Sequence, residues 1–320
     1  MAKSITDVQG ITVGSKENLQ ALTGCTVVLT GREGAVCGVD VRGSAPGTRE
    51  TDGLAPINMI DRVHAVLLSG GSAYGLDAAG GVMQYLEEHG IGHQTGPALV
   101  PIVPAAVIYD LAVGDCKVRP DKEMGYLAAR DAGIIVSEGN VGAGAGATVG
   151  KIRGYDYCTK GGLGTWSVSL ENGLTVGAIV VVNSFGDVIN PGGEIVAGVR
   201  DDEGTAFIGT ELAWMQNKAA GAYAMATNTT IAVVACNAKL DKTQMTKVAQ
   251  MAHDGLARVI NPIHTMCDGD TVFALCTGGI QVDVNIVGYM AQKVLAHAVL
   301  RAVLAAQTIQ GYRCCKDKGL

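Results

Sequence analysis

The chain has 320 residues, of which 48% are hydrophobic and 17% charged, and its formal net charge is −6. The length allows one large domain or two ordinary ones, and the acidic balance argues against a protein that binds nucleic acid through a basic surface. A composition with 45 glycines and 4% aromatic residues favours a compact α/β or α+β enzyme over a disordered chain.

Short apolar segments separated by glycine turns fill the first third of the chain. Residues 26–30 and 35–40 flank a glycine-containing turn, and this pattern predicts a β-hairpin. A buried strand is expected at 64–68. The apolar spacing then becomes helical over 76–88, with Gly90 in the position of a C-terminal cap.

The middle of the chain alternates between helix and strand signals. A second helix is expected over 121–132, and residues 174–182 and 186–189 are expected to be paired strands. The stretch 203–226 is rich in Ala and Met, and we expect it to be mostly helical or mobile. Its length and composition make it, like 91–105, a segment that could shape a substrate pocket.

The last third has the clearest elements. Apolar runs predict strands at 231–236 and 272–276, and Asp241 caps an amphipathic helix that continues to Val259. Its apolar face is formed by Met245, Val248, Ala249, Ala252 and Leu256. A final helix over 286–307 has so little charge on any face that we expect it to be central and buried. No linker or repeat interrupts the pattern, which predicts a single domain over 1–320.

Targeting and cysteine patterns are weak in this chain. Residues 1–8 have no apolar segment with a cleavage site, and no apolar run reaches the ~18 residues of a membrane span. We therefore expect a cytoplasmic protein with no membrane partner. The nine cysteines show no CxxC spacing, so we expect reduced thiols rather than disulfides or a zinc site. The alternative is that adjacent Cys314 and Cys315 form an exposed redox or metal pair.

The glycine-rich stretch 142–151 suggests a phosphate loop but does not fit one. The pattern GxxxxGK[ST] needs glycine where the chain has Ala145 and a hydroxyl where it has Ile152. The dinucleotide pattern GxGxxG fails at Ala147. We expect no nucleotide or other cofactor, although the loop could still bring backbone amides and Lys151 near a substrate.

Two polar clusters stand directly before two of the predicted strands. Asn228-Thr229-Thr230 precedes the run 231–236, and a cluster containing Asp268 and Asp270 precedes 272–276. A hydroxyl nucleophile and a carboxylate pair at strand edges are the parts of an amide hydrolase that cuts its own backbone. The alternatives are a structural threonine, because β-branched residues favour strands, and a solvated Asp-Gly-Asp turn.

Histidines give no metal pattern, because neither HExxH nor HxH spacing occurs. His264 lies near the Asp268–Asp270 pair and could orient it, or it could be a structural histidine. We therefore expect no metal at the site.

Taken together, these segments resemble the family of L-aminopeptidase D-Ala-esterase/amidases, which also contains β-aminopeptidases and the nylon-oligomer endohydrolase. The resemblance extends over nearly the whole chain. It is carried by Asp52-Gly53, 68–76, 106–110, 144–151, 181–183, 228–231 and 268–271. The Asn-Thr-Thr form at 228–230 looks most like the nylon-oligomer branch.

The resemblance implies an α+β fold, a four-layer αββα sandwich with two central β-sheets. It also implies autoproteolysis between Asn228 and Thr229, which gives an α chain of residues 1–228 and a β chain of residues 229–320. Thr229 would become the N-terminal nucleophile of the β chain. A homo-oligomer, a tetramer of αβ units, is expected from the family.

The same resemblance assigns roles to further residues. Tyr109 and Asn183 match positions that hold the substrate carbonyl or the oxyanion, and Lys151, Asp268 and Asp270 match polar residues around the nucleophile. Some relatives have Ser and Glu in place of the two aspartates, so the division of acid and base roles stays open. In the matching segment 68–76, substrate contacts are expected from Gly70, Gly71 and Tyr74.

The resulting prediction is a self-processing amidohydrolase or aminopeptidase that acts on short peptides or peptide-like amides. Two alternatives remain. The acyl-enzyme could be resolved by an amino acid, as in ornithine acetyltransferases of the same architecture, or the fold could be a non-catalytic small-molecule binding protein.

Overall fold

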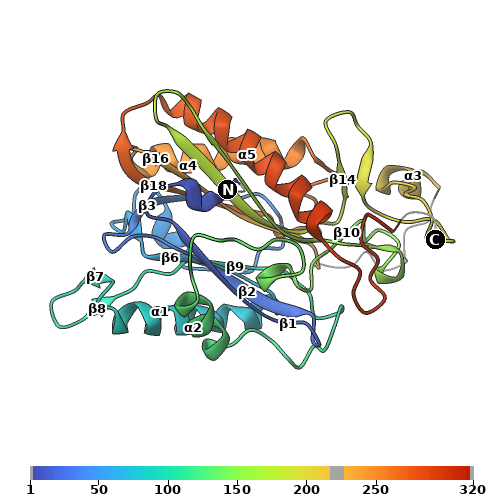
Figure 1. The fold of residues 1–320 in the computed structure, drawn as a ribbon, viewed down its shortest axis with the longest axis horizontal. Helices are drawn as coiled ribbons and strands as arrows, with labels where there is room; N and C mark the ends of the chain where they lie inside the picture. Colours follow the sequence, from blue (N-terminus) through green and yellow to red (C-terminus); the bar gives the residue numbers. More distant parts are fainter. Residues whose placement is uncertain (1–2, 217–226, 318–320) are drawn as a thin grey trace.

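Two β-sheets lie face to face in the middle of the molecule, and a pair of helices covers the outer side of each (Figure 1). The computed structural model describes residues 3–216 and 227–317. The order of layers is helix, sheet, sheet, helix, as the resemblance implied.

The first sheet has five strands in the order β1-β2-β6-β9-β4. Neighbouring strands are antiparallel except β6 and β9, which are parallel. The strands are β1 (Thr12–Asn18), β2 (Thr23–Leu29), β6 (Ala65–Ser69), β9 (Ala105–Val107) and β4 (Thr48–Arg49).

The second sheet has six strands in the order β12-β13-β16-β18-β3-β5. Its single parallel pair is β16 with β18. The strands are β12 (Gly162–Ser169), β13 (Thr175–Asn183), β16 (Thr229–Ala238), β18 (Thr271–Ile280), β3 (Ala35–Val41) and β5 (Arg62–Val63).

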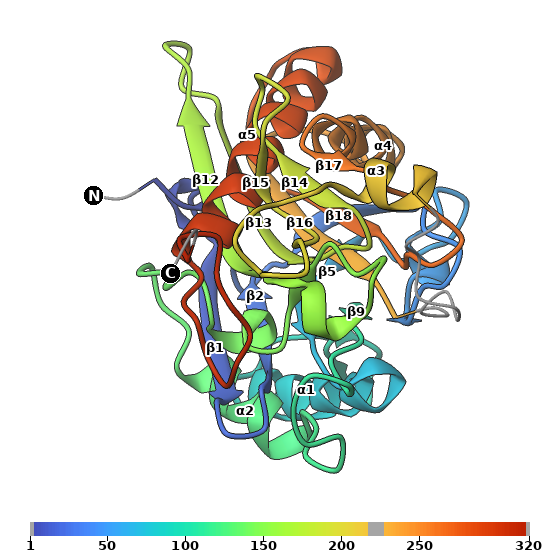
Figure 2. The same cartoon turned by 90° about the vertical axis from the view of Figure 1, so that its right-hand side faces the viewer.

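The helices lie outside the sheets. The first sheet is covered by α1 (Ala78–Glu88) and α2 (Lys122–Arg130), and the second by α4 (Lys242–Ala257) and α5 (Val284–Ala305). A short helix α3 (Thr210–Met215) lies near a small sheet beyond the main layers (Figure 2). The small strands are β14 (Asp187–Ile189), β15 (Ile195–Ala197), β17 (Ile260–Asn261), β7 (His93–Gln94), β8 (Leu99–Val100), β10 (Thr148–Val149) and β11 (Thr159–Lys160).

Strand β16 shows why the run from Ile231 to Cys236 is apolar at every position. Ile231, Val233 and Ala235 face the core between the two sheets. Their neighbours along the strand, beginning with Ala232 and Val234, face the core beneath α4 and α5. Because both faces are buried, the strand has no polar alternation. Burying each Val or Ile stabilises the fold by about 1.5–3 kcal/mol.

Several expected elements are confirmed. Asp241 accepts a hydrogen bond from the Gln244 amide and forms a capping box at the start of α4. All five expected apolar residues of α4 are buried. Asp121 caps α2, and Gly90, with φ +66°, follows α1 in the left-handed conformation of a C-terminal cap.

Two expected strand pairings are wrong. The hairpin over 26–30 and 35–40 does not form, because β2 and β3 belong to different sheets. Gly38 explains the position of β3: a Cβ there would come within 2.2 Å of the Thr246 nitrogen, so the strand lies directly under α4. Likewise β13 and β14 do not pair, because β14 pairs with β15 and β17 instead.

Two expected helices differ from the structure. Helix α5 is not central, because it forms an outer layer and exposes Tyr289 and Leu304 by 48% each. Only α3 is helical within the described part of the stretch 203–226, and residues 217–226 lie outside the described residues.

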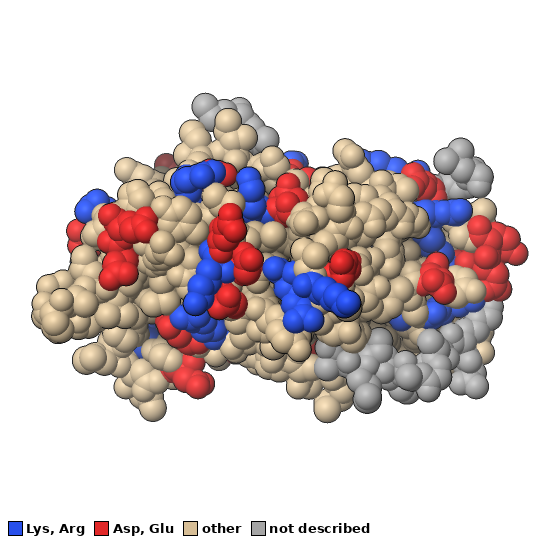
Figure 3. All heavy atoms as spheres, turned by 90° about the horizontal axis from the view of Figure 1, so that it is seen from below, with Lys and Arg blue, Asp and Glu red and all other residues tan. Residues whose placement is uncertain are grey.

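The surface carries both signs of charge. On the face shown in Figure 3, Lys and Arg side chains are interspersed with Asp and Glu side chains. Among the described residues, no helix has the length and apolar character that a membrane crossing requires.

Candidate active site

Three strand ends of the second sheet meet at the junction of Asn228 and Thr229. Strand β16 begins at Thr229, which lies opposite Asn183 at the end of β13. On its other side, Asn228 forms a parallel bridge with Asp268, just before β18 begins. The sheet register thus brings together residues that are 46 and 40 positions apart in the chain.

The carbonyl group between Asn228 and Thr229 has two hydrogen-bond donors. The Thr229 hydroxyl donates to the Asn228 carbonyl oxygen, and the Gly269 amide donates to the same oxygen at 2.9 Å. Gly269 has no room for a side chain, because a Cβ would lie 2.9 Å from the Thr229 hydroxyl oxygen. The nucleophile candidate, the carbonyl and an amide donor are therefore packed together and nearly excluded from solvent.

Asp270 links the start of β16 to His264. One carboxylate oxygen accepts the Thr230 amide at 2.6 Å, and the other lies 2.8 Å from the His264 ring nitrogen Nδ1 and 3.2 Å from its backbone nitrogen. His264 adopts the left-handed conformation, with φ +57°, which a residue with a side chain rarely adopts. Its ring also packs edge-on against His253, with 4.8 Å between centroids.

Asp268 is the second buried carboxylate. It accepts hydrogen bonds from the Thr265 amide at 3.0 Å, the Thr265 hydroxyl at 2.6 Å and the Phe185 amide at 3.3 Å. Burial, followed by the nearby charge of Asp270, raises the pKa of Asp268 to about 6. Two adjacent aspartates thus have different environments, which is a feature of acid–base sites.

Lys151 and Asn183 form the polar group on the other side of Thr229. The Lys151 ammonium donates to the Asn183 carbonyl at 2.9 Å, the Asn183 side-chain oxygen at 2.8 Å and the Thr227 carbonyl at 3.4 Å. The Asn183 side-chain nitrogen also donates to the Thr227 carbonyl, at 3.4 Å. Burial lowers the pKa of Lys151 to about 7.

The remaining expected site residues lie at different places. The Tyr109 carbonyl accepts the Asn183 side-chain nitrogen at 3.2 Å, so Tyr109 belongs to the same group. Gly71 donates its amide to Asp110 at 2.7 Å, next to Tyr109 in the chain, and Gly70 packs against the same carboxylate.

Tyr74 lies outside this hydrogen-bonded group of described residues. It is 59% exposed, and its ring lies 3.7 Å from the Arg119 guanidinium.

The glycine-rich stretch is held in part by Lys160. Lys160 donates to the carbonyls of Gly144 at 2.9 Å, Ala147 at 2.8 Å and Gly161 at 3.1 Å. A Cβ at Gly146 would lie 2.1 Å from the Leu22 carbonyl oxygen, so close packing explains the glycine there. Lys151, at the end of the stretch, does lie in the site.

One part of the site could not be found in the sequence. The Gly269 amide meets the Asn228 carbonyl only because β16 and β18 are parallel in a particular register, and the Asp-Gly-Asp motif does not reveal that register. The close contact between His264 and Asp270 had only a weak signal in the sequence, because the two residues are six positions apart.

The cysteines do not support the alternative of an exposed pair. Cys314 and Cys315 are both buried, and the Cys315 thiol donates to the Val303 carbonyl at 3.2 Å. Within the described ranges, no group of three or more His, Cys, Asp or Glu residues has metal-ligand geometry.

Comparison with known proteins gives the family. Peptidase family S58 matches residues 3–316. The chain belongs to this family. An uncharacterized aminopeptidase of Mycobacterium tuberculosis is 43% identical, and the match covers 98% of this chain and 97% of the relative. A 6-aminohexanoate-oligomer endohydrolase of Paenarthrobacter ureafaciens is 31% identical, covering 92% of this chain and 84% of the relative. The S58 chain is thus a hydrolase of peptide or amide bonds.

Solved structures agree on the fold. A β-aminopeptidase of a Burkholderia species has a TM-score of 0.71 at 22% identity, covering 98% of this chain and 90% of its own. The L-aminopeptidase D-Ala-esterase/amidase of Ochrobactrum anthropi has a TM-score of 0.72 at 20% identity, with coverage of 96% and 87%. That structure is described as a variant of the Ntn hydrolase fold, so the expected architecture is confirmed.

Proposed function

We propose that this S58 chain is a self-processing amidohydrolase, which cuts itself between Asn228 and Thr229 and then uses Thr229 to hydrolyse short peptides or peptide-like amides. One observation carries the proposal: the Asn228 carbonyl oxygen accepts both the Thr229 hydroxyl and the Gly269 amide. A nucleophile and an oxyanion donor on one carbonyl are what an acyl transfer requires.

Self-cleavage begins with attack of the Thr229 oxygen on the Asn228 carbonyl carbon. The hydroxyl proton passes to a base, and the developing negative charge on the Asn228 oxygen is stabilised by the Gly269 amide. The bond between the Asn228 carbon and the Thr229 nitrogen then breaks, and the nitrogen takes a proton. The product is an ester, which one water molecule hydrolyses to the Asn228 carboxylate and the free Thr229 hydroxyl.

The cut creates the group that later turnover needs. The new α-amine of Thr229 titrates near ~8, so part of it is neutral at cellular pH and can accept the hydroxyl proton. Asp270 fixes the strand at Thr230, one residue from this amine. We assign Asp270 to orienting the new chain end, and ionised Asp268 to accepting or relaying the proton.

Substrate turnover repeats the same chemistry with an external amide. The substrate carbonyl takes the place of the Asn228 carbonyl, Thr229 becomes acylated, the amine leaves and water releases the acid. Lys151 and Asn183, with Tyr109, lie on the acyl side of this position. Loss of one such donor typically raises the barrier by ~3 kcal/mol.

The relatives support the substrate class. Among them are aminopeptidases and a 6-aminohexanoate-oligomer endohydrolase, which all break amide bonds. We further propose that the α chain 1–228 and the β chain 229–320 stay together as one domain, that αβ units form a homo-oligomer, and that the protein works in the cytoplasm.

A denaturing gel with two substitutions tests the proposal. Wild type and Thr229→Ser should give bands of roughly 23 and 10 kDa, in proportion to length, from the 32.8 kDa chain. Thr229→Ala should give one intact, folded and inactive chain. A single band for active wild type contradicts the proposal. Transfer of the acyl group to an added amino acid faster than to water would instead indicate an acyltransferase.

A further inference from the structure

Two buried side-chain oxygens at the scissile bond have no hydrogen-bond partner within the described part of the chain. They are Oδ1 of Asn228 and the hydroxyl oxygen of Thr230. Both residues are 0% exposed. A buried polar atom without a partner destabilises a protein unless a water molecule satisfies it. The chemistry described above uses neither of these oxygens, so their presence beside the reacting carbonyl needs an explanation.

The two side chains project from one face of the second sheet. Thr230 lies opposite Val182, which belongs to the core beneath α4 and α5. Asn228 is two residues before Thr230, so strand alternation points its side chain to the same face. Thr229 shares the opposite face with Ile231, which belongs to the core between the two sheets. The Thr229 hydroxyl and the two unpaired oxygens therefore lie on opposite sides of the scissile bond.

The two site carboxylates share the face of the unpaired oxygens. Asn228 bridges Asp268 in parallel register, and the same register places Thr230 beside Asp270. Residues that pair across parallel strands project to the same side of a sheet. The Asp270 carboxylate also accepts the Thr230 amide at 2.6 Å. This face of the scissile bond is thus the polar one.

The Asn228 side chain is fixed so that Oδ1 stays unpaired. Its amide nitrogen Nδ2 donates to the Cys267 carbonyl at 3.2 Å, and its backbone nitrogen donates to the same carbonyl at 3.3 Å. The oxygen and nitrogen of a carboxamide point in different directions, so Oδ1 faces away from this carbonyl. Only Cα, Cβ and Cγ separate Oδ1 from the Asn228 carbonyl carbon. A molecule held by Oδ1 therefore lies next to the reacting atom.

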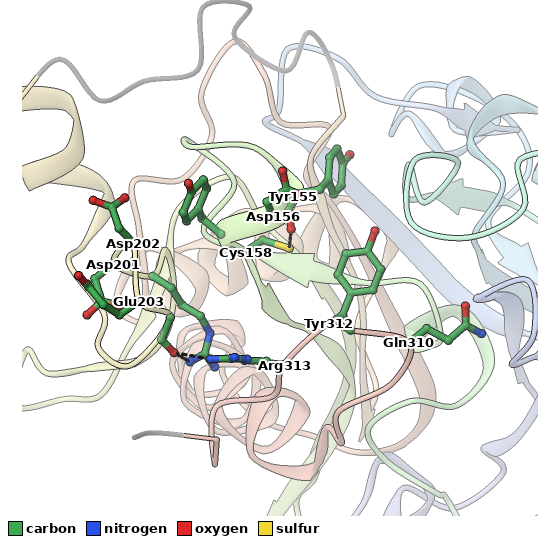
Figure 4. A pocket seen from close by; sticks show the side chains of 13 residues that line it. Tyr155, Asp156, Cys158, Asp201, Asp202, Glu203, Gln310, Tyr312 and Arg313 are labelled. Atoms are coloured by element: carbon green, nitrogen blue, oxygen red, sulfur yellow. Dashed lines mark hydrogen bonds between the residues drawn. The ribbon is translucent and has the colours of Figure 1, made fainter. Parts of the chain in front are cut away.

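The space beside these oxygens is closed. A cavity of about 430 Å³, lined by segments 155–158, 200–204 and 310–313, is shown in Figure 4. Neither Asn228 nor Thr230 lines it, and both residues are sealed from solvent. A closed polar site suits a single water molecule, which typically makes about 2–4 hydrogen bonds to buried polar atoms.

We propose that Asn228 Oδ1 and the Thr230 hydroxyl hold the water molecule that hydrolyses the ester formed during self-cleavage. The inference rests on the proposed function, because only the attack by Thr229 creates this ester. The Thr229 oxygen reaches the carbonyl carbon from the face between the sheets. Water then approaches the ester carbon from the other face, where the Thr229 nitrogen has just left.

The hydrolysis needs no group beyond the water and the cut residues. The water oxygen bonds to the Asn228 carbonyl carbon and passes a proton to the new Thr229 amine, while the Gly269 amide stabilises the negative charge on the carbonyl oxygen. The bond from this carbon to the Thr229 oxygen breaks, and the amine returns the proton to that oxygen. The new Asn228 acid gives its remaining proton to the amine, which leaves a carboxylate and a free hydroxyl.

Two substitutions remove the oxygens that hold the water. Thr230→Val keeps the shape of the side chain without its hydroxyl, and Asn228→Ala removes Oδ1. Each should slow the separation of the two chains by about tenfold, the effect of one hydrogen bond. The matched control is Thr230→Ser, which keeps the hydroxyl and should process as wild type does. The ester has the mass of the uncut chain, so slowed variants should accumulate as one band.

Hydroxylamine distinguishes a lost water from a lost attack, because it cleaves an ester without a placed water. Freshly translated Thr230→Val should give both bands once neutral hydroxylamine is added, with a hydroxamate on residue 228 in the mass spectrum. A slow Thr230→Val chain that hydroxylamine leaves whole has lost the attack step, and this result overturns the proposal. Thr230→Val decides, because Asn228→Ala also removes the hydrogen bond to the Cys267 carbonyl.

Wild type and Thr229→Ala on the same gel separate the two proposals. Thr229→Ala forms no ester, so hydroxylamine should leave it whole. If wild type cuts itself and Thr230→Val does so equally fast, the water site is wrong while the proposed function stands. If active wild type remains uncut, the proposed function fails and the water site fails with it.

Discussion

Lys151 and Lys160 are two buried lysines at opposite ends of the segment that connects β10 to β11. Their burial is alike, but their hydrogen-bond partners differ. Burial lowers the pKa of each to about 7. Lys160 donates to the backbone carbonyls of Gly144 and Ala147 in the glycine-rich stretch and to that of its chain neighbour Gly161. Lys151 gives two to Asn183 and its longest bond to the Thr227 carbonyl.

The difference lies in the acceptors, not in burial or pKa. All acceptors of Lys160 are carbonyls of buried residues away from the cut, whereas the Thr227 carbonyl belongs to the segment that self-cleavage would release. Lys151 would then have a donor available for substrate, and Lys160 would not. A lowered pKa alone therefore does not identify a catalytic lysine.

The largest expected effect is on Lys151. Lys151→Met should lower kcat by about a thousandfold, because it removes a buried donor beside the reacting carbonyl. The measurement is anilide hydrolysis by protein whose fold is checked by circular dichroism. Lys160→Met is the control. An equal loss of kcat per folded molecule in both variants would contradict a catalytic role that Lys151 has and Lys160 lacks.

Asp270→Asn should lower kcat by about a hundredfold, because the charge that orients the new chain end is lost while the Thr230 amide keeps an acceptor. Steady-state kinetics on pre-cut enzyme measure this loss. If Asp270→Asn turned over at the wild-type rate, Asp270 would have no catalytic role.

Lys160→Met should lower the stability of the fold. Three buried carbonyls would lose their donor, which should lower the free energy of unfolding by about 3 kcal/mol. Urea denaturation of this variant beside wild type gives the value. A change below about 0.5 kcal/mol, the range of ordinary surface substitutions, would mean that the glycine-rich stretch does not depend on this lysine.

The pH dependence of kcat sharpens the same contrast. Asp268, with its pKa raised to about 6, and the Thr229 amine, which titrates near ~8, must both be unprotonated to take the hydroxyl proton, so activity should rise as pH passes about 6 and go on rising towards ~8. Lys151, with its pKa lowered to about 7, loses above that pH the positive charge that strengthens its hydrogen bonds, which opposes this rise and gives the profile an alkaline limb. The alkaline limb should persist in Lys160→Met, although that lysine also titrates near 7. If Lys160→Met lost the alkaline fall in activity, that fall would belong to Lys160 and not to Lys151.

The smallest expected effect concerns His264. His264→Leu should lower kcat about tenfold, because Asp270 loses one partner. His264→Asn should stay within about threefold of wild type, because Asn tolerates the left-handed backbone and its side-chain amide can replace Nδ1 as donor. Equal activity of the two variants would show that the ring does not position Asp270.

Local pattern was enough to predict much of the fold. The uninterrupted apolar run at 231–236 predicts a strand buried on both faces, and it lies in β16. Asp241 predicts a helix start, and α4 begins directly after it. Which strands pair was not predictable in the same way. The segments 26–30 and 35–40 form an ideal hairpin pattern, yet Gly38 packs under α4 in the other sheet.

The site was predictable through the resemblance and only in part through spacing. Thr229 and Asp270 each stand at the start of a predicted strand. This pattern places both residues at strand ends, but it does not show that the two strand ends are neighbours. The Gly269 amide gave no sequence signal, because the position of a backbone donor is set by the register of β16 and β18. Tyr74 matched the family segment but lies exposed beside Arg119.

Trapping the acyl-enzyme is the most direct test of Thr229 as a nucleophile at a new chain end. Active enzyme is quenched in acid during turnover, and the fragments are weighed and mapped by mass spectrometry. The account predicts a β chain that begins at Thr229, heavier by the mass of the acyl group, with the added mass on residue 229. Acyl mass on any other residue, or on an uncut chain, would contradict it.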